Sequence, residues 1–147
     1  MKKIIIIILL LVIVVTGCKK KAFSLEEKYY DEANLVEIDD SKFNELLENK
    51  ESFAIFIYEP SCITSSEFSK VIEEFSEKYN LYLYSISFQD MKNTVLSEKV
   101  KFCPSFAIYK KGKLVDYLDA SSDEDTDVYK SVDNLSEWFF GYVNKQF

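Results

Sequence analysis

The fold is decided by residues 53–65, which read Phe53-Ala-Ile-Phe-Ile-Tyr-Glu-Pro-Ser-Cys62-Ile-Thr-Ser65. The first six form a continuous apolar run, typical of a strand that is buried on both faces of a sheet. Pro60 and Ser61 end that run. Beyond Cys62, apolar side chains recur at steps of three and four residues, which predicts a long amphipathic helix; they are Phe68, Val71, Ile72, Phe75 and Tyr79. The sequence therefore predicts a cysteine at the junction of a buried strand and a helix.

The segments on either side continue an alternation of strands and helices. Periodicity and turn residues predict strands at 35–38, 81–88, 106–109 and 114–118, with a tight turn at Lys111-Gly112 between the last two. They also predict helices that begin with a cap at Asp40 or Ser41, run from Asp90 to about Lys99, and close the chain over 135–143. The chain has 147 residues without a repeat or an internal linker, so we expect one α/β domain.

The N-terminal segment has the pattern of an export signal. Lys2 and Lys3 precede an apolar run, 4–15, which would form about 18 Å of helix at ~1.5 Å per residue and is too short for a bilayer core of roughly 30 Å. The following Val15-Thr-Gly-Cys18 resembles the lipobox of bacterial lipoproteins, in which the cysteine is lipidated and becomes the new N-terminus. We expect a lipoprotein signal peptide at 1–17, a lipidated tether at 18–32 and a folded domain at 33–147.

This pattern also predicts a location. Lipid on Cys18 would hold the domain at the extracytoplasmic face of the cell membrane. The alternative is an N-terminal anchor that is never cleaved, and it places the domain at the same face.

Charge limits the partners. The chain has 18 Lys and Arg residues against 25 Asp and Glu residues, a net charge of −7, and no histidine. Nucleic acids require a basic surface, so we expect no nucleic-acid partner. An acidic run could supply oxygen ligands to calcium, but it lacks the glycine of an EF-hand loop and is typical of solvated surface, so we predict no metal and no cofactor; its members are Asp119, Asp123, Glu124, Asp125 and Asp127.

Three cysteines are an odd number for an exported protein. Lipidation of Cys18 leaves Cys62 and Cys103, and thiols outside the cytoplasm tend to be oxidised or redox-active. A domain of this size folds without a disulfide, so the pair more readily serves chemistry than stability. A structural disulfide and two unlinked buried thiols remain alternatives.

A second stretch, Cys103-Pro-Ser-Phe-Ala-Ile-Tyr-Lys-Lys-Gly112-Lys, completes a family resemblance. Together with residues 53–65 it resembles the thioredoxin family over roughly residues 33–146. The resemblance implies a thioredoxin-like fold, a central mixed β-sheet flanked by helices on both faces, with a cis-proline at Pro104 beside the nucleophile Cys62. It also implies that Pro104, Cys103 and Ser61 contact a client segment. The general layout is loosely similar to that of thioredoxin-like bacteriocin transport accessory proteins.

The departures from the family pattern change the expected chemistry. Ser65 stands where the family has its second cysteine, Phe56 where it has a buried acid, and Ser61 where it has a tryptophan. The usual dithiol cycle is therefore unavailable. We expect Cys103 to serve as a substitute partner that can form a disulfide with Cys62, and the Ser65 hydroxyl to donate to the thiolate.

The thiolate itself follows from its predicted place on a helix. Unpaired N–H groups and the positive end of the helix dipole favour the charged form of Cys62. A carboxylate at Glu59, if it faces the thiol, would oppose ionisation.

Two functions remain open from the sequence. The first is membrane-anchored thiol–disulfide exchange on exported client proteins or with a membrane redox or transport partner. The second is a redox-inactive thioredoxin fold that acts as a binding or scaffold protein in export. A monothiol that carries small thiols as a mixed disulfide is a third possibility.

Overall fold

The structure, a computed structural model, describes residues 21–146. Its elements alternate between strands and helices, with short 3-10 helices labelled η. In chain order they are η1 (Glu27–Tyr29), β1 (Asn34–Glu37), α2 (Asp40–Glu48), β2 (Ala54–Tyr58), α3 (Ile63–Tyr79), β3 (Tyr82–Ser87), α4 (Phe88–Met91), η2 (Val95–Glu98), β4 (Ser105–Lys110), β5 (Lys113–Tyr117), η3 (Val128–Lys130) and α5 (Val132–Phe140).

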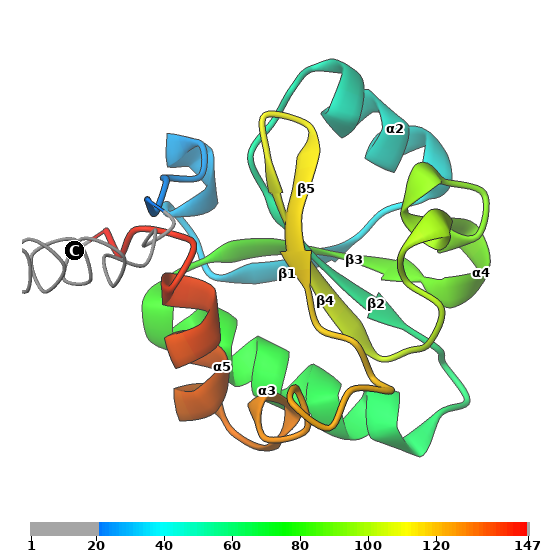
Figure 1. Cartoon of the computed structure of the whole chain (residues 1–147). Helices are drawn as coiled ribbons and strands as arrows, with labels where there is room; N and C mark the ends of the chain where they lie inside the picture. Colours follow the sequence, from blue (N-terminus) through cyan, green and yellow to red (C-terminus); the bar gives the residue numbers. More distant parts are fainter. Residues whose placement is uncertain (1–20, 147) are drawn as a thin grey trace, which may run out of the picture.

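The strands form one mixed sheet in the order β1-β3-β2-β4-β5 (Figure 1). Strands β1, β3 and β2 are parallel, whereas β4 runs antiparallel to β2 and β5 antiparallel to β4. Strand β2, the continuous apolar run of the sequence, lies in the middle, and its first four residues are buried. The predicted α/β class with a central mixed sheet is confirmed.

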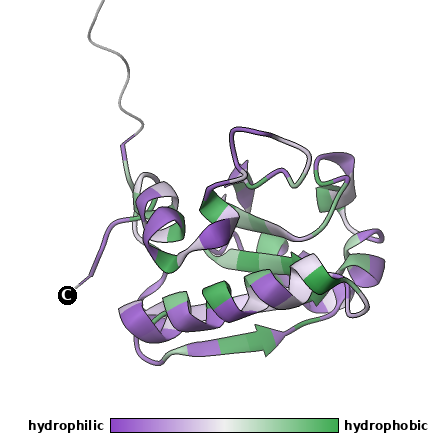
Figure 2. Ribbon diagram, turned by 90° about the horizontal axis from the view of Figure 1, so that it is seen from below, coloured by the Kyte–Doolittle hydropathy of each residue, from purple (hydrophilic) through white to green (hydrophobic). Residues whose placement is uncertain are grey.

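Helices cover both faces of the sheet, α2 and α4 on one and α3 and α5 on the other (Figure 1). On the second face Phe75 of α3 packs against Phe106 of β4 and Phe139 of α5, with ring centroids 6.5 and 5.1 Å away. On the first face Phe43 of α2 meets Phe53, just before β2, at 6.1 Å. The strands are mostly hydrophobic, while hydrophilic and hydrophobic residues alternate along the helices (Figure 2). This pattern is expected when each helix buries one stripe.

Capping side chains set the helix boundaries, and they differ in detail from the predicted ones. Asp39, not Asp40 or Ser41, caps α2, and its carboxylate accepts a hydrogen bond from the Lys42 N–H at 2.8 Å. The helix predicted from Asp90 to Lys99 is instead two short helices. Ser87 caps α4 ahead of the predicted start, and Thr94 caps η2. Short polar side chains that bond the backbone thus divide this segment.

The predicted turn between β4 and β5 lies at Lys111 and Gly112, which both have positive φ, 50° and 72°. Two such residues form the type I′ turn that suits a two-residue hairpin. Glycine is required at the second place, because a Cβ there would lie 2.5 Å from the Leu47 carbonyl oxygen.

The N-terminal segment corrects the predicted domain boundary. Residues 18–32 were expected to be a tether, but Phe23, Leu25 and Tyr29 are buried in the core. Phe23 forms a bridge with Val143, donating its N–H to the Tyr142 carbonyl at 2.9 Å and accepting from the Asn144 N–H at 2.7 Å. The tether prediction is therefore wrong from Phe23 onward. The signal peptide predicted at 1–17 and the lipidation site Cys18 lie outside the described residues.

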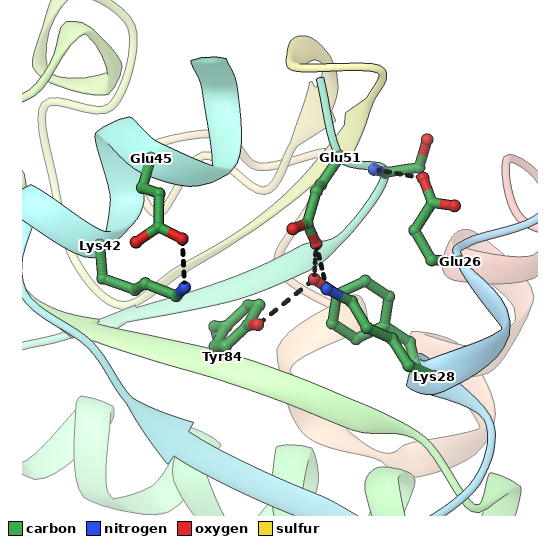
Figure 3. Close-up of polar contacts among 8 residues, drawn as sticks. Glu26, Lys28, Lys42, Glu45, Glu51 and Tyr84 are labelled. Atoms are coloured by element: carbon green, nitrogen blue, oxygen red, sulfur yellow. Dashed lines mark hydrogen bonds and ion pairs between the residues drawn. The ribbon is translucent and has the colours of Figure 1, made fainter. Parts of the chain in front are cut away.

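A polar cluster fastens the same segment to the domain (Figure 3). The Lys28 ammonium lies 2.6 Å from a carboxylate oxygen of Glu51, and the Tyr29 hydroxyl donates to that same oxygen. The Tyr29 and Tyr84 hydroxyls lie 3.3 Å apart. Burial raises the pKa of Tyr29, so its hydroxyl stays protonated and can donate. Burial also pushes the pKa of Glu51 upward, but the hydrogen bonds from Lys28 and Tyr29 outweigh it and the pKa is lowered.

Within residues 21–146, no helix has the length and apolarity that crossing a bilayer requires.

Candidate active site: two thiols at the start of α3

The reactive-cysteine candidate, Cys62, is the N-cap residue of α3 and is partly exposed. It follows β2 through a tight turn in which the Cys62 N–H donates to the Glu59 carbonyl at 3.0 Å. Pro60 and Ser61 lie exposed on that turn. The fully buried strand and the amphipathic helix are both anchored in the core, so the thiol between them is held at the surface. This is the junction that the sequence predicts.

The surroundings of Cys62 favour its thiolate. Its sulfur lies 2.9 Å from the Thr64 hydroxyl oxygen. Hydrogen bonding from the Thr64 hydroxyl, followed by the backbone N–H of Ser65, lowers the pKa of Cys62, and partial burial opposes this only in part. The donors belong to the first turn of α3, where N–H groups have no helical partner. A lowered pKa increases the fraction of thiolate, which is the nucleophilic form.

Ser65, which replaces the family's second cysteine, is 2% exposed. Its hydroxyl accepts a hydrogen bond from the Glu59 N–H at 3.1 Å and so fixes the turn before Cys62. The same hydroxyl lowers the pKa of both Cys62 and Cys103. Ser65 thus contacts the two thiols without offering a thiol of its own.

Cys103 is partly exposed, and its peptide bond to Pro104 is cis. It lies just outside the sheet, because the ladder between β2 and β4 ends at the Ile57–Ser105 pair. Among the described residues, no backbone hydrogen bond involves the N–H or the C=O of Cys103. Both groups therefore remain available to an extended segment that approaches this edge. Pro104 itself is buried.

The pKa values of the two thiols are shifted in opposite directions, and the charge of Cys62 acts on Cys103. Burial, followed by the charge of Cys62 and then that of Glu59, raises the pKa of Cys103. Both cysteines are free thiols in this structure. At neutral pH the arrangement therefore combines a thiolate-prone Cys62 with a protonated Cys103. The Glu59 charge contributes to raising the pKa of Cys103, whereas the leading causes of the Cys62 shift are the donors of α3.

A groove opens beside the Cys103–Pro104 step, with a volume of about 480 Å³. One wall is α3, through Thr64, Glu67 and Phe68, and the other is the segment between β5 and α5. Tyr129 joins that segment to the site, because its hydroxyl donates to the Pro104 carbonyl at 3.1 Å. Ser61, predicted to contact a client, does not line this groove.

Sequence reasoning missed two residues of this site. Thr64 is polar and lies two positions after Cys62, a signal that could have identified it as a donor in the first helical turn. Tyr129 lies in a segment without periodicity, and nothing in the sequence connects it with Pro104. No group of three or more metal-ligating side chains gathers anywhere in residues 21–146.

The role of Thr64 can be measured. Thr64→Val keeps the shape of the side chain but removes the hydroxyl that contributes most to lowering the pKa of Cys62. We expect the pH midpoint for alkylation of Cys62 by iodoacetamide to move upward and the rate at neutral pH to fall several-fold, since only the thiolate reacts. The control is Ser66→Ala, which removes a hydroxyl from an exposed residue two positions after Thr64. Equal profiles for the two variants would contradict this role.

Comparison with known proteins agrees with this geometry. The family model described as Thioredoxin matches residues 34–133, and no curated protein matches the chain significantly. Among solved structures, oxidised thioredoxin O1 from Arabidopsis thaliana is 16% identical, with a TM-score of 0.53 over 71% of this chain and 96% of that one. Oxidised thioredoxin from Plasmodium falciparum is 18% identical, with a TM-score of 0.53 over 72% and 98%.

A chain from the crystal structure of the complex of ferredoxin:thioredoxin reductase with thioredoxin f2 is 22% identical, with a TM-score of 0.52 over 65% of this chain and 91% of that one. At these identities the structural likeness shows the fold alone. The family model, in contrast, covers more than half of the sequence. The chain belongs to the thioredoxin family.

Proposed function

We propose that this protein is a membrane-anchored, extracytoplasmic thiol–disulfide exchange protein that acts on exported client proteins. Cys62 is the attacking thiolate and Cys103 the partner thiol. The observation that carries the proposal is the place of Cys62, a partly exposed N-cap residue of α3 whose sulfur lies 2.9 Å from the Thr64 hydroxyl. The directions of the two pKa shifts, lowered for Cys62 and raised for Cys103, agree with it. The thioredoxin fold itself suggests thiol–disulfide chemistry.

The exchange proceeds in two steps. The Cys62 thiolate attacks one sulfur of a client disulfide, forms a mixed disulfide with it, and releases the other client sulfur as a thiolate that takes up a proton from water. Cys103 then loses its proton to water, and its sulfur attacks the Cys62 sulfur. This forms a Cys62–Cys103 disulfide and releases the client's second thiol. The client gains two electrons and the protein loses two, so an external thiol or dithiol reductant must restore the cycle.

The position of the N-terminal segment is compatible with an anchor. The Asn80 side chain, at the C-terminal end of α3, donates to the Tyr30 carbonyl at 2.8 Å and accepts from the Ala33 N–H at 3.2 Å. Cys62 lies at the other end of this 17-residue helix, about 25 Å away at ~1.5 Å per residue. A chain anchored through lipid on Cys18 would therefore present its thiols away from the membrane, where client proteins can reach them.

Trapping tests the exchange. The full chain, purified in detergent, is mixed with a peptide disulfide and analysed by intact mass. We expect a transient peptide adduct on the wild type, followed by a protein mass two hydrogens lower than that of the reduced form. Cys62→Ser should form neither species. A wild type that is as unreactive as Cys62→Ser would instead support the redox-inactive scaffold, and a stable adduct with small thiols alone would support the monothiol.

Fatty-acid labelling tests the anchor separately. In bacterial cells we expect the label on the wild type and none on Cys18→Ala. Labelling of neither protein would remove the lipid anchor from the proposal without affecting the exchange chemistry.

A further inference from the structure

The groove that Cys103 and Pro104 line has apolar side chains along it and one wall held by hydrogen bonds. Its lining includes Phe68 and Val71 from α3, Ala120 and Tyr129 from the segment between β5 and α5, and Cys103 at one end. The Phe68 and Tyr129 rings pack with centroids 4.6 Å apart. Tyr129 is further held by its hydrogen bond to the Pro104 carbonyl at 3.1 Å. The apolar lining therefore continues directly into the reactive site.

The wall opposite α3 is built by its own hydrogen bonds. The Asp119 N–H donates to the Asp125 carboxylate at 2.8 Å, which closes the segment into a loop. The Asn134 side chain, on α5, donates to the Asp127 carbonyl at 2.9 Å and ties the loop to the body of the domain. Together with the bond from Tyr129 to Pro104, these contacts hold the wall of the groove in one position.

Acidic residues outnumber basic ones around the groove. Five acidic residues lie within 119–127 of the wall, and Glu67 lines the groove from the α3 side. Lys130 also lines the groove, but its ammonium lies 2.6 Å from the Asp127 carboxylate and is largely offset by it. The acids of 119–127 belong to the loop that forms the wall and are not among the residues that line the groove. A basic partner would find complementary charge at Glu67 and in this acidic loop, whereas an acidic partner would be repelled.

We propose that this groove selects its clients: it binds an extended segment that carries basic and apolar side chains next to the disulfide-bonded cysteine. The apolar side chain packs against Phe68 and Tyr129, and the basic side chains approach Glu67 and the acidic loop 119–127 at the margin of the groove. Cys103 lines the groove, so a client segment bound there brings its disulfide-bonded cysteine close to the reactive Cys62. Tyr129 is the positioning residue, because it holds the wall against Pro104. This inference rests on the proposed exchange function and names the class of client.

Two peptide disulfides of the same length and apolar sequence test the selection, one with two lysines and one with two glutamates beside the cysteine. A neutral small disulfide, dipyridyl disulfide, is measured in parallel, and each peptide rate is divided by the rate with this reagent. At low salt the full chain should form the mixed disulfide about tenfold faster with the basic peptide, and the difference should shrink as salt is added.

Variants locate the selectivity in the groove. Glu67→Gln should reduce the preference for the basic peptide, whereas Glu74→Gln, on an exposed part of α3 outside the groove, is the matched control. Tyr129→Phe, which keeps the ring but removes the bond to Pro104, should also lower the preference. A purely structural role of Tyr129 would change stability and leave the ratio of the two peptides unaltered.

The outcomes separate this inference from the function on which it rests. Failure of Cys62 to react even with dipyridyl disulfide would overturn the exchange function. Normal reaction with that reagent, but equal rates for the two peptides, would overturn only the selection. A dimer in light scattering that Glu67→Gln dissociates would also overturn it, because the groove would then be occupied by a second copy of the chain.

Discussion

Replacement of Cys103 by serine should leave the client covalently attached to Cys62. In the wild type a second thiol lies beside the mixed disulfide and acts at an effective concentration of millimolar or more. In Cys103→Ser only dissolved thiols can resolve the adduct. With micromolar thiol in solution, we expect the adduct to persist at least about 10²-fold longer than in the wild type. Quenching with acid at timed intervals, followed by intact mass, measures this lifetime.

The two steps should also differ in their response to pH. The pKa of Cys62 is lowered, so its attack reaches a plateau at a lower pH than that of an ordinary thiol. In the mixed disulfide Cys62 is uncharged, but burial and the Glu59 charge still raise the pKa of Cys103, so resolution continues to accelerate at higher pH. We therefore expect the wild-type adduct to accumulate near neutral pH and to disappear faster as the pH rises. In Cys103→Ser that acceleration should be absent.

The mixed disulfide with the client should form only when Cys62 is present. Cys62→Ser, which retains Cys103, is the control and should give no adduct near neutral pH because the remaining thiol is protonated. If the Cys103→Ser adduct decayed as fast as that of the wild type, Cys103 would not be the resolving thiol. Water or a dissolved thiol would then complete the reaction, as expected for a monothiol protein.

The parts of the fold that could be predicted are those in which one local pattern has one physical solution. The continuous apolar run 53–58 has to be buried on both faces, and it lies in the middle of the sheet. The helical periodicity after Cys62 likewise predicted α3. In the strand and the helix, neighbours in sequence are also neighbours in space, so periodicity alone is informative. The place of the Cys103–Pro104 step beside Cys62, in contrast, was implied by the family resemblance.

The rest depends on contacts between segments that are far apart in the chain. Residues 23–30 mix polar, apolar and aromatic side chains without a period, and contacts with distant residues, such as the bridge from Phe23 to Val143 and the bond from Tyr29 to Glu51, attach them to the core. Likewise, the pKa that the Glu59 charge shifts depends on how the two thiols are arranged in space, which the sequence does not show. The hydrogen bond from Tyr129 to Pro104 spans 25 positions. Such contacts leave no trace in local composition.

The packed N-terminal segment leads to the second large effect. Phe23→Ala should lower the free energy of unfolding by about 3 kcal/mol, within the usual range for truncation of a buried phenylalanine. Phe23 is 9% exposed, and Lys110 lies over its ring with the ammonium 5.1 Å from the centroid. Its backbone bridge to Val143 does not depend on the side chain, so the loss comes from buried area and the cavity left behind. Urea denaturation of the full chain measures the change.

The matched control is the same substitution at an exposed phenylalanine. Phe102 is 57% exposed, so Phe102→Ala should change the free energy of unfolding by no more than about 0.5 kcal/mol. If residues 18–32 were a tether, as the sequence suggested, Phe23→Ala would cost as little as Phe102→Ala. A difference of several-fold between the two variants, with equal denaturant slopes, would instead place the domain boundary before Phe23. Any lipid anchor at Cys18 would then be only a few residues from the packed Phe23, and because a residue spans at most ~3.3–3.6 Å, the domain would stay close to the membrane surface.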